Sequence, residues 1–102
     1  RKIMKKHEEL REKFKWGQRY DKNENKLKKV KFRLLKDISD SHLINICIYF
    51  TENTEELANI YEDNDMDFLP VEVRMWMKKH LYFLNEIKYR LDNNIKVPDY
   101  AS

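Results

Sequence analysis

The sequence of 102 residues contains little glycine, proline or cysteine: one Gly, two Pro and one Cys. The single glycine, Gly17, excludes the glycine-rich loops that bind phosphate. Cys47 stands alone, so it cannot form an intramolecular disulfide, and no Cys or Cys/His spacing is typical of zinc. We therefore expect no cofactor and no metal site, and a reducing compartment rather than secretion.

Long apolar runs are also absent. No stretch approaches the roughly 18 apolar residues of a membrane-spanning helix, and no signal peptide is recognisable. These absences predict a cytoplasmic protein with no membrane partner. Aromatic residues make up 13% of the chain, which is too many for a disordered protein of this polarity.

Charge is segregated along the chain, although the net charge is only +3. Residues 1–36 hold fifteen Lys or Arg and five acids, residues 37–73 hold ten acids and no Lys or Arg, and residues 74–102 hold six bases and three acids. Blocks of opposite charge attract each other. Either the blocks neutralise each other, within the fold or in a homo-oligomer, or the basic third binds an anion.

The longest periodic stretch runs from Phe68 to Asn94. Its apolar residues recur every three or four positions and predict one broad face in the core, formed by Val73, Met77, Leu81, Leu84, Ile87 and Leu91, with Trp76, His80 and Phe83 beside them. Pro70 suits the first helical turn, and Asn93 and Asn94 mark the end. We predict a scaffold helix from Pro70 to Asp92.

The first third of the chain predicts a helix followed by a β-hairpin. Residues 3–14 form an amphipathic pattern, residues 16–20 suit a strand, and residues 21–25 suit a polar turn. In the second strand, apolar and basic residues alternate: Val30, Phe32 and Leu34 with Lys29, Lys31 and Arg33. This alternation predicts an apolar face on the core and a basic face in solvent.

Residues 40–50 predict a buried helix. Ser39 or Asp40 can cap its N-terminus, and the run from Leu43 to Phe50 is apolar nearly all round, so we expect burial on more than one side. The β-branched residues of this run also permit a central strand, which remains an alternative. A capping box at residues 53–56 predicts a separate short helix over residues 55–61.

An acidic link before the long helix imitates the start of a calcium loop. Asp63, Asp65 and Asp67 alternate as in an EF-hand, but Phe68 and Arg74 occupy the positions that require Gly and Glu. A solvated loop is expected, with weak binding of divalent ions as the alternative.

Histidines and other titratable residues form no recognisable catalytic motif. His7 lacks the second histidine that a zinc-protease helix requires, and neither His42 nor His80 has an identifiable acid or nucleophile near it in the sequence. We therefore expect no catalytic residues and no enzymatic activity.

Together these elements predict an α+β fold in a single domain of residues 1–102. It comprises an N-terminal helix, a basic β-hairpin, and then helices that end in the long one. Residues 1–14 suit a helical arm, and residues 95–102 suit an extended tail because Pro98 disfavours helix before it.

Two motifs carry a resemblance to known proteins. Residues 16–21, Trp-Gly-Gln-Arg-Tyr-Asp, precede a helix start, Ser-Asp-Ser-His-Leu-Ile-Asn, at residues 39–45. This pair resembles small, mostly uncharacterised proteins of bacteriophages and prophages, which end in a long helix rich in Leu, Tyr and Arg, as Tyr89 and Arg90 suggest here. The resemblance covers about residues 15–97. Many members have Gly where this chain has Glu24, so a wider loop is expected. The resemblance implies that the protein is encoded by a phage or another mobile element.

We expect a non-catalytic interaction protein that binds and inhibits or modulates a host factor, such as a defence or gene-expression component. The expected contact residues are the aromatic and cationic ones of the hairpin, Trp16, Arg19, Tyr20, Lys29, Lys31 and Arg33. The alternative is a protein that binds nucleic acid or a nucleotide messenger with the same residues. A homo-oligomer joined by its charged blocks is a third option.

Overall fold

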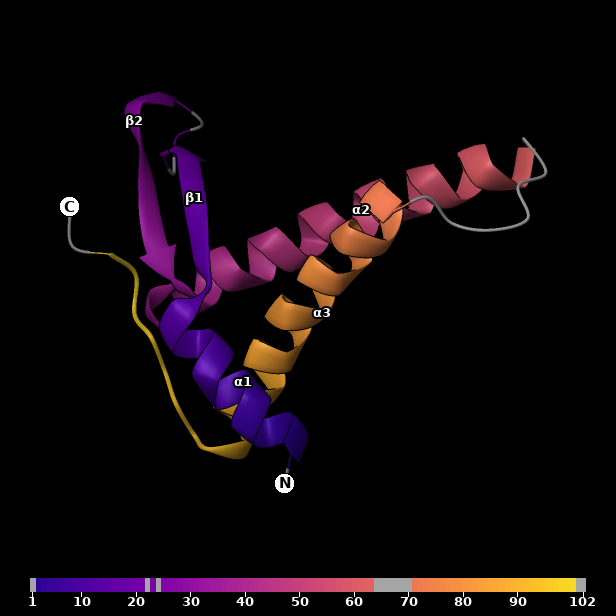
Figure 1. Ribbon diagram of the computed structural model, residues 1–102. Coiled ribbons are helices and arrows are strands. Elements are labelled where there is room, and N and C mark those ends of the chain that lie inside the picture. The colour runs from indigo at the N-terminus through magenta and orange to yellow at the C-terminus, as the bar shows by residue number, and fades with distance from the viewer. Residues whose placement is uncertain (1, 22, 24, 64–70, 101–102) are drawn as a thin grey trace. The chain divides into compact units, whose positions relative to one another are not determined.

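The structure is a computed structural model that describes residues 2–21, 23, 25–63 and 71–100 (Figure 1). The predicted α+β fold is confirmed: an N-terminal helix and a two-stranded antiparallel hairpin precede two long helices. The chain divides into two compact units, Arg1–Ile38 and Ser39–Ser102. The single domain stays a prediction. None of the described helices combines the length and apolar character needed to cross a membrane.

The first unit contains helix α1 (Lys2–Lys13), strands β1 (Lys15–Tyr20) and β2 (Lys26–Leu34), and a 3-10 turn (Leu35–Asp37). The turn returns to the end of α1, where the Leu35 N–H donates to the Phe14 carbonyl at 2.9 Å. Lys36 Nζ lies 2.8 Å from Glu12 Oε2. Leu35 and Ile38 are fully buried, so this turn anchors the hairpin to α1.

The hairpin pairs Lys15 with Leu34 and continues in register to Gln18 opposite Lys31. Between Gln18 and Tyr20 the register is irregular, and Tyr20 pairs with Lys26. Extra residues on one strand of an antiparallel pair bend and twist it. The tip of the hairpin therefore leaves the regular ladder.

A single carboxylate organises the described part of the turn. Asp21 Oδ1 accepts the N–H groups of Asn23 and Asn25, both at 2.9 Å, and the Asp21 N–H donates to the Asn25 carbonyl at 2.9 Å. An Asp side chain commonly closes turns in this way. The described turn therefore relies on Asp21 rather than on glycine.

The second unit begins with α2 (Asp40–Asp63), which corrects the prediction of two separate helices over residues 40–61. Ser39 caps it as predicted, since Ser39 Oγ accepts the His42 N–H at 3.2 Å. The strand alternative for this run is wrong. At the predicted break, Thr51 Oγ1 donates to the Cys47 carbonyl at 2.9 Å and Asn53 Nδ2 to the Tyr49 carbonyl at 2.8 Å. These polar side chains bond back to the preceding turn instead of capping a new helix.

Helix α2 is buried on one side only, which corrects the expectation of burial on several sides. Leu43, Ile46, Cys47 and Phe50 are buried, whereas three apolar residues of the same run are about half exposed: Ile44, Ile48 and Tyr49. Helix α3 (Val71–Asp92) supplies the packing partner. Pro70 and the calcium-like aspartates 65 and 67 lie outside the described residues.

Aromatic rings form the centre of the α2–α3 contact. Phe50 lies between α3 residues, with ring centroids 4.3 Å from Trp76, 5.4 Å from His80 and 5.6 Å from Phe83. Trp76 Nε1 also donates to Thr54 Oγ1 at 3.3 Å. The two helices are therefore antiparallel, with residues near Thr54 level with residues near Trp76.

The buried side of α3 agrees with the predicted one only in part: Val73 is buried as predicted. Val73, Phe83, Glu86 and Arg90 are buried, whereas much of the expected core face is exposed by 44–76%: Met77, Leu81, Leu84 and Leu91. Two charged residues occupy the core side because they pair with each other, as described below. The apolar repeat of Met77, Leu81, Leu84 and Leu91 therefore does not mark the side of α3 that packs in the core.

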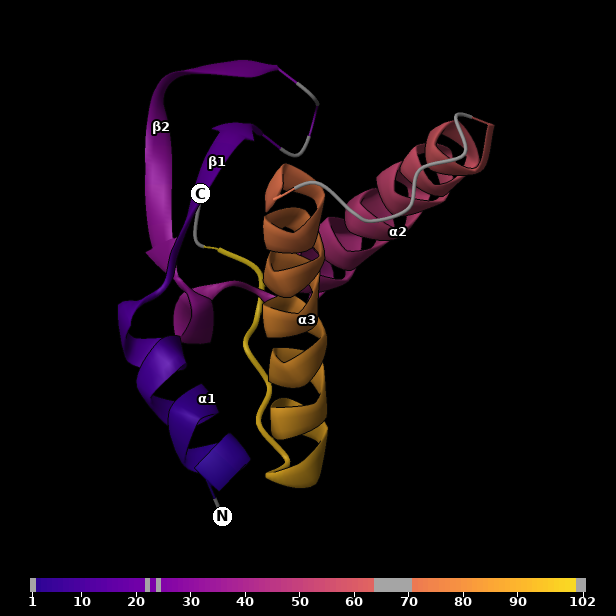
Figure 2. The same ribbon diagram turned by 45° about the vertical axis from the view of Figure 1, so that its right-hand side comes forward.

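The end of α3 sends the tail back towards the start of α2 (Figure 2). Asn94 adopts a left-handed backbone conformation with φ 54°. The Ile95 N–H donates to the Arg90 carbonyl at 2.8 Å and the Asn94 N–H to the Leu91 carbonyl at 3.4 Å. This is the Schellman pattern, in which Asn replaces the usual Gly.

Candidate partner-binding surface on the hairpin

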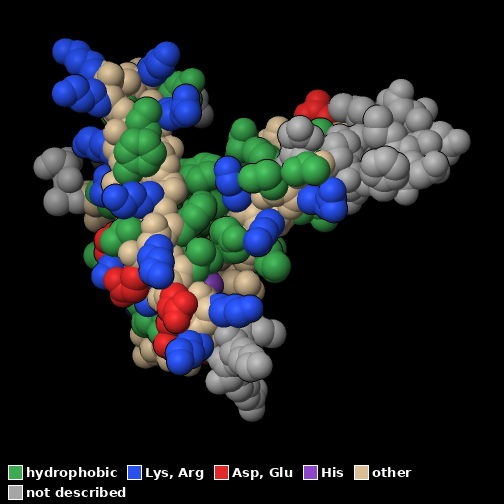
Figure 3. Space-filling model, viewed as in Figure 1, with side chains coloured by type: hydrophobic (Ala, Val, Ile, Leu, Met, Phe, Trp, Pro, Cys, Tyr) green, Lys and Arg blue, Asp and Glu red, His purple; other side chains and the backbone are tan. Residues whose placement is uncertain are grey.

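The two strands of the hairpin are rich in positive charge. Their sequences, KWGQRY and KLKKVKFRL, contain seven Lys or Arg and no acid. All but one of these seven side chains are exposed, the half-buried exception being Arg33. Figure 3 shows these Lys and Arg side chains projecting from the hairpin. The hairpin therefore offers a concentrated cationic surface.

The cations project from both faces of the hairpin, because successive side chains of a strand alternate. Trp16 pairs with Arg33 and Gln18 with Lys31, so these four share one face. Arg33 Nε donates to Gln18 Oε1 at 3.4 Å. Arg19 lies where the register becomes irregular. Within the described part of the chain, no acid forms an ion pair with Arg19 or Lys31.

An exposed apolar spot lies on the face that carries Gly17. Gly17 pairs with Phe32, and a Cβ at Gly17 would lie 2.8 Å from Val30 Cγ1 and 3.2 Å from Phe32 Cε1. Glycine is therefore required for these side chains to lie across the neighbouring strand. Phe32 is 67% exposed and Val30 is 39% exposed.

This exposure corrects the prediction that Val30 and Phe32 enter the core. The alternation in β2 was identified correctly, but the hairpin has apolar residues and cations on both faces, and neither face is fully covered. Of the three apolar residues of this alternation, Leu34, next to the anchoring turn, is half-buried, and Val30 and Phe32 are exposed. A two-stranded sheet has too few neighbours to bury a whole face.

The six predicted contact residues are not brought to a single face. Trp16, Lys31 and Arg33 share one face of the regular ladder, and Arg19 lies at the register irregularity between Gln18 and Tyr20. Lys29 and Tyr20 belong to the irregular end, where both are exposed. Trp16 is half-buried and Arg33 is held by Gln18, so the more accessible contacts are the remaining four.

Sequence reasoning missed Phe32 and Val30 as surface residues. Their signal was present, since each has Lys or Arg on both sides in β2. An aromatic residue between cations suits an exposed binding strand as well as a core strand. The pattern alone could not separate the two.

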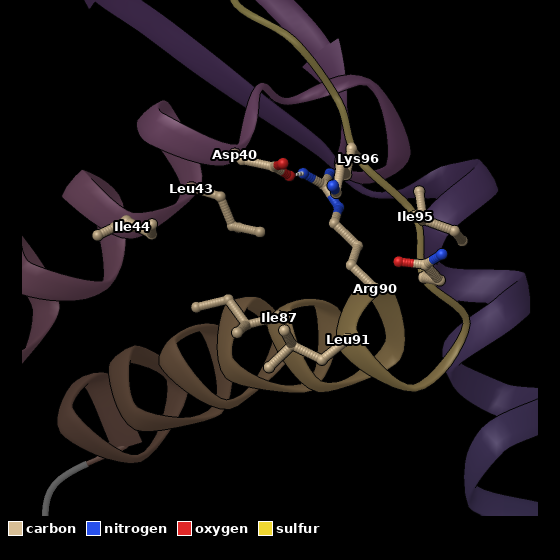
Figure 4. Close-up of a pocket in the computed structure, with 9 residues that line it drawn as sticks. Asp40, Leu43, Ile44, Ile87, Arg90, Leu91, Ile95 and Lys96 are labelled. Carbon is tan, nitrogen blue, oxygen red and sulfur yellow. Dashed lines mark hydrogen bonds and ion pairs between the residues drawn. The ribbon is translucent and has the colours of Figure 1, made fainter.

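A second candidate is a groove of about 320 Å³ in the second unit, between α2 and α3 (Figure 4). Leu43 and Ile44 from α2 and Ile87 and Leu91 from α3 form its apolar walls, and Ile95 of the tail closes one side. At its polar end Arg90 bonds Asp40 at 2.8 Å. Asn94 and Lys96 also line the groove.

The three histidines and the cysteine are buried or packed against other side chains. His7 is buried in the first unit, while in the second unit His42 contacts Tyr100 and His80 stacks on Phe50. Cys47 is buried, and burial raises the pKa of its thiol, which disfavours the thiolate. Among the described residues, no three His, Cys, Asp or Glu side chains form a metal-binding group.

Comparisons with known proteins found no match among models of protein families, curated proteins or solved structures.

Proposed function

We propose that this chain is a non-catalytic binding protein whose hairpin holds an acidic surface of a partner protein. The observation that carries the proposal is the apolar spot of Val30 and Phe32 on strands that contain seven cations and no acid. Protein interfaces commonly have an apolar or aromatic centre within a polar rim. Cations in the rim would steer an acidic partner and set its orientation.

The resemblance to phage proteins supports a partner from the host cell, such as a defence or gene-expression component, and hence action in the host cytoplasm. Binding that blocks or modulates such a factor requires no catalytic group in this chain. Arg19, Tyr20 and Lys29, at the irregular end of the hairpin, would border Phe32, and Lys31 on the opposite face would add to the positive charge that steers an acidic partner. Trp16 and Arg33 would support the strand pair from the opposite face.

The test compares capture of host proteins by the tagged chain and by matched variants. Phe32→Ala and the pair Lys29→Gln with Lys31→Gln should each lose the captured protein with melting temperatures nearly unchanged. The control pair, Lys5→Gln with Lys6→Gln, removes two exposed cations from α1 and should retain it. Equal loss in hairpin and control variants would show a non-specific charge effect and would overturn the proposal.

A second candidate, binding of single-stranded nucleic acid, is favoured by the exposure of Phe32 and Tyr20, 67% and 56%. Exposed aromatic rings stack on bases while neighbouring cations neutralise phosphates. Fluorescence anisotropy with labelled oligo-dT and oligo-U tests it. Affinity should fall steeply with salt, and Lys31→Gln should lower the salt slope by about 1. Absence of binding at low salt would rule this candidate out.

A further inference from the structure

One side of the second unit presents apolar side chains to solvent. Ile44 and Ile48 of α2 are 51% and 49% exposed, and four α3 residues are exposed by 44–76%: Met77, Leu81, Leu84 and Leu91. We call these six residues the exposed apolar face. Ile44 and Leu91 line the same groove between the helices (Figure 4), so α2 and α3 contribute to one side. Figure 3 shows hydrophobic side chains gathered over these helices.

The spacing of this face suits another helix. Met77, Leu84 and Leu91 are seven residues apart in α3, and Ile44 and Ile48 are four apart in α2. Seven-residue repeats form the seams along which helices pack against each other. Scattered exposed apolar residues are ordinary, but a contiguous face marks an interaction site.

The charges beside the exposed apolar face are complementary between the two helices. On α2, Glu52 and Glu55 are exposed; on α3, Arg74 and Lys78 are exposed. The hydrogen bond from Trp76 Nε1 to Thr54 Oγ1, 3.3 Å long, places these two pairs at the same level along the helices. The sequence of α2 contains no Lys or Arg, so its acids have no partner on their own helix.

We propose that a second copy of this chain covers the exposed apolar face, with a twofold axis that runs lengthwise between α2 and α3. Rotation about such an axis places α2 of one protomer over α3 of the other. It does not change the position of any residue along the axis. Glu52 and Glu55 of one protomer then meet Arg74 and Lys78 of its partner. The same contacts form twice, as in any isologous interface.

The other twofold arrangement is less favourable. An axis across the helices would place α2 against α2 and α3 against α3. Because α2 contains no Lys or Arg, Glu52 and Glu55 would then meet no cation on the helix opposite them. The charges therefore select both the occupant and its orientation. The dimer is independent of the partner proposed for the hairpin.

Sedimentation velocity of the full chain over a range of micromolar concentrations tests the proposal. The wild type should be a dimer, and Leu81→Glu with Leu84→Glu should be a folded monomer by circular dichroism. Met75→Glu is the control, because Met75 is 57% exposed and lies about 160° around α3 from Met77, at 100° per residue. A monomeric wild type, or a control as disruptive as the double variant, would overturn it.

A charge swap between copies tests the orientation. Copies with Glu52→Lys and Glu55→Lys, and copies with Arg74→Glu and Lys78→Glu, should each dimerise at least ten times more weakly than wild type. Mixed together, they should form a heterodimer, because both contact regions regain opposite charges. Homodimers of undiminished strength, or a mixture that stays monomeric, would refute the proposed arrangement.

Discussion

Arg90 near the end of α3 binds Asp40 at the start of α2, with Nη1 2.8 Å from Oδ1. Its Nε lies 2.7 Å from Oε2 of Glu86, one turn earlier on α3. Asp40 also exchanges bonds with Val97: the Asp40 N–H donates to the Val97 carbonyl at 3.0 Å, and Asp40 Oδ2 accepts the Val97 N–H at 3.2 Å. One pair of residues thus joins a helix start, a helix end and the tail.

Replacement of the buried cation should destabilise the second unit strongly. Glu86 is 0% exposed and Arg90 is 4% exposed, so Arg90→Met leaves a buried carboxylate without its guanidinium. The expected loss is about 3 kcal/mol of the free energy of unfolding, measured by urea denaturation. Adding Glu86→Leu should recover most of it, because an apolar pair tolerates burial. A small loss in the single variant would contradict the importance of this pairing.

His80 should make stability depend on pH. Its Nε2 is buried with no hydrogen-bond partner among the described residues, and burial lowers the pKa of the imidazole. The unfolded chain therefore takes up the proton first, so stability should fall as pH falls below about 6.5.

His80→Phe should reduce this dependence and raise stability by about 1 kcal/mol, because the unpaired nitrogen is removed. The new ring can keep the stack on Phe50, because the planes of the His80 and Phe50 rings are inclined by only 14°. Thermal melts of both proteins at neutral and mildly acidic pH provide the check. An unchanged pH dependence in the variant would show that other groups cause it.

The order of elements could be predicted from the sequence because local signals define it. The Ser39 cap, the asparagines after α3 and the alternation in β2 each depend on a few neighbouring residues. The continuity of α2 was missed because Thr51 and Asn53 can either start a helix or bond back within one. In the structure both side chains bond back, to the carbonyls of Cys47 and Tyr49.

The choice of buried side could not be predicted, because it depends on long-range partners. Met77, Leu84 and Leu91 have the periodicity of a core face, yet the partner of α3 within this unit contacts Trp76, His80 and Phe83 instead. The core position of Arg90 is explained only by Asp40, 50 residues away in the sequence. Phe32 was expected in the core because the alternation in β2 shows only its sequence neighbours and not whether another element covers that face.

Gly17→Ala should destabilise the hairpin by about 1 kcal/mol, because the new methyl group meets two side chains that must move. Its Cβ would lie 2.8 Å from Val30 Cγ1. Adding Val30→Ala removes that contact and should restore part of the loss. Amide chemical shifts of β1 and β2 report the change. If the second substitution restores nothing, the contact with Val30 is not the cause.

The hydroxyl of Tyr100 should hold the tail against the start of α2. Tyr100 Oη accepts the Ser39 N–H at 3.0 Å and lies 2.6 Å from His42 Nδ1. Tyr100→Phe keeps the ring beside His42 but removes both bonds, so about 1 kcal/mol should be lost and the Ser39 amide should exchange faster. Tyr49→Phe is the matched control, since Tyr49 is half exposed and contacts its neighbours through its ring. Equal effects of the two substitutions would show that other contacts hold the tail, such as those of Asp40 with Val97 and of Ser41 with Asp99.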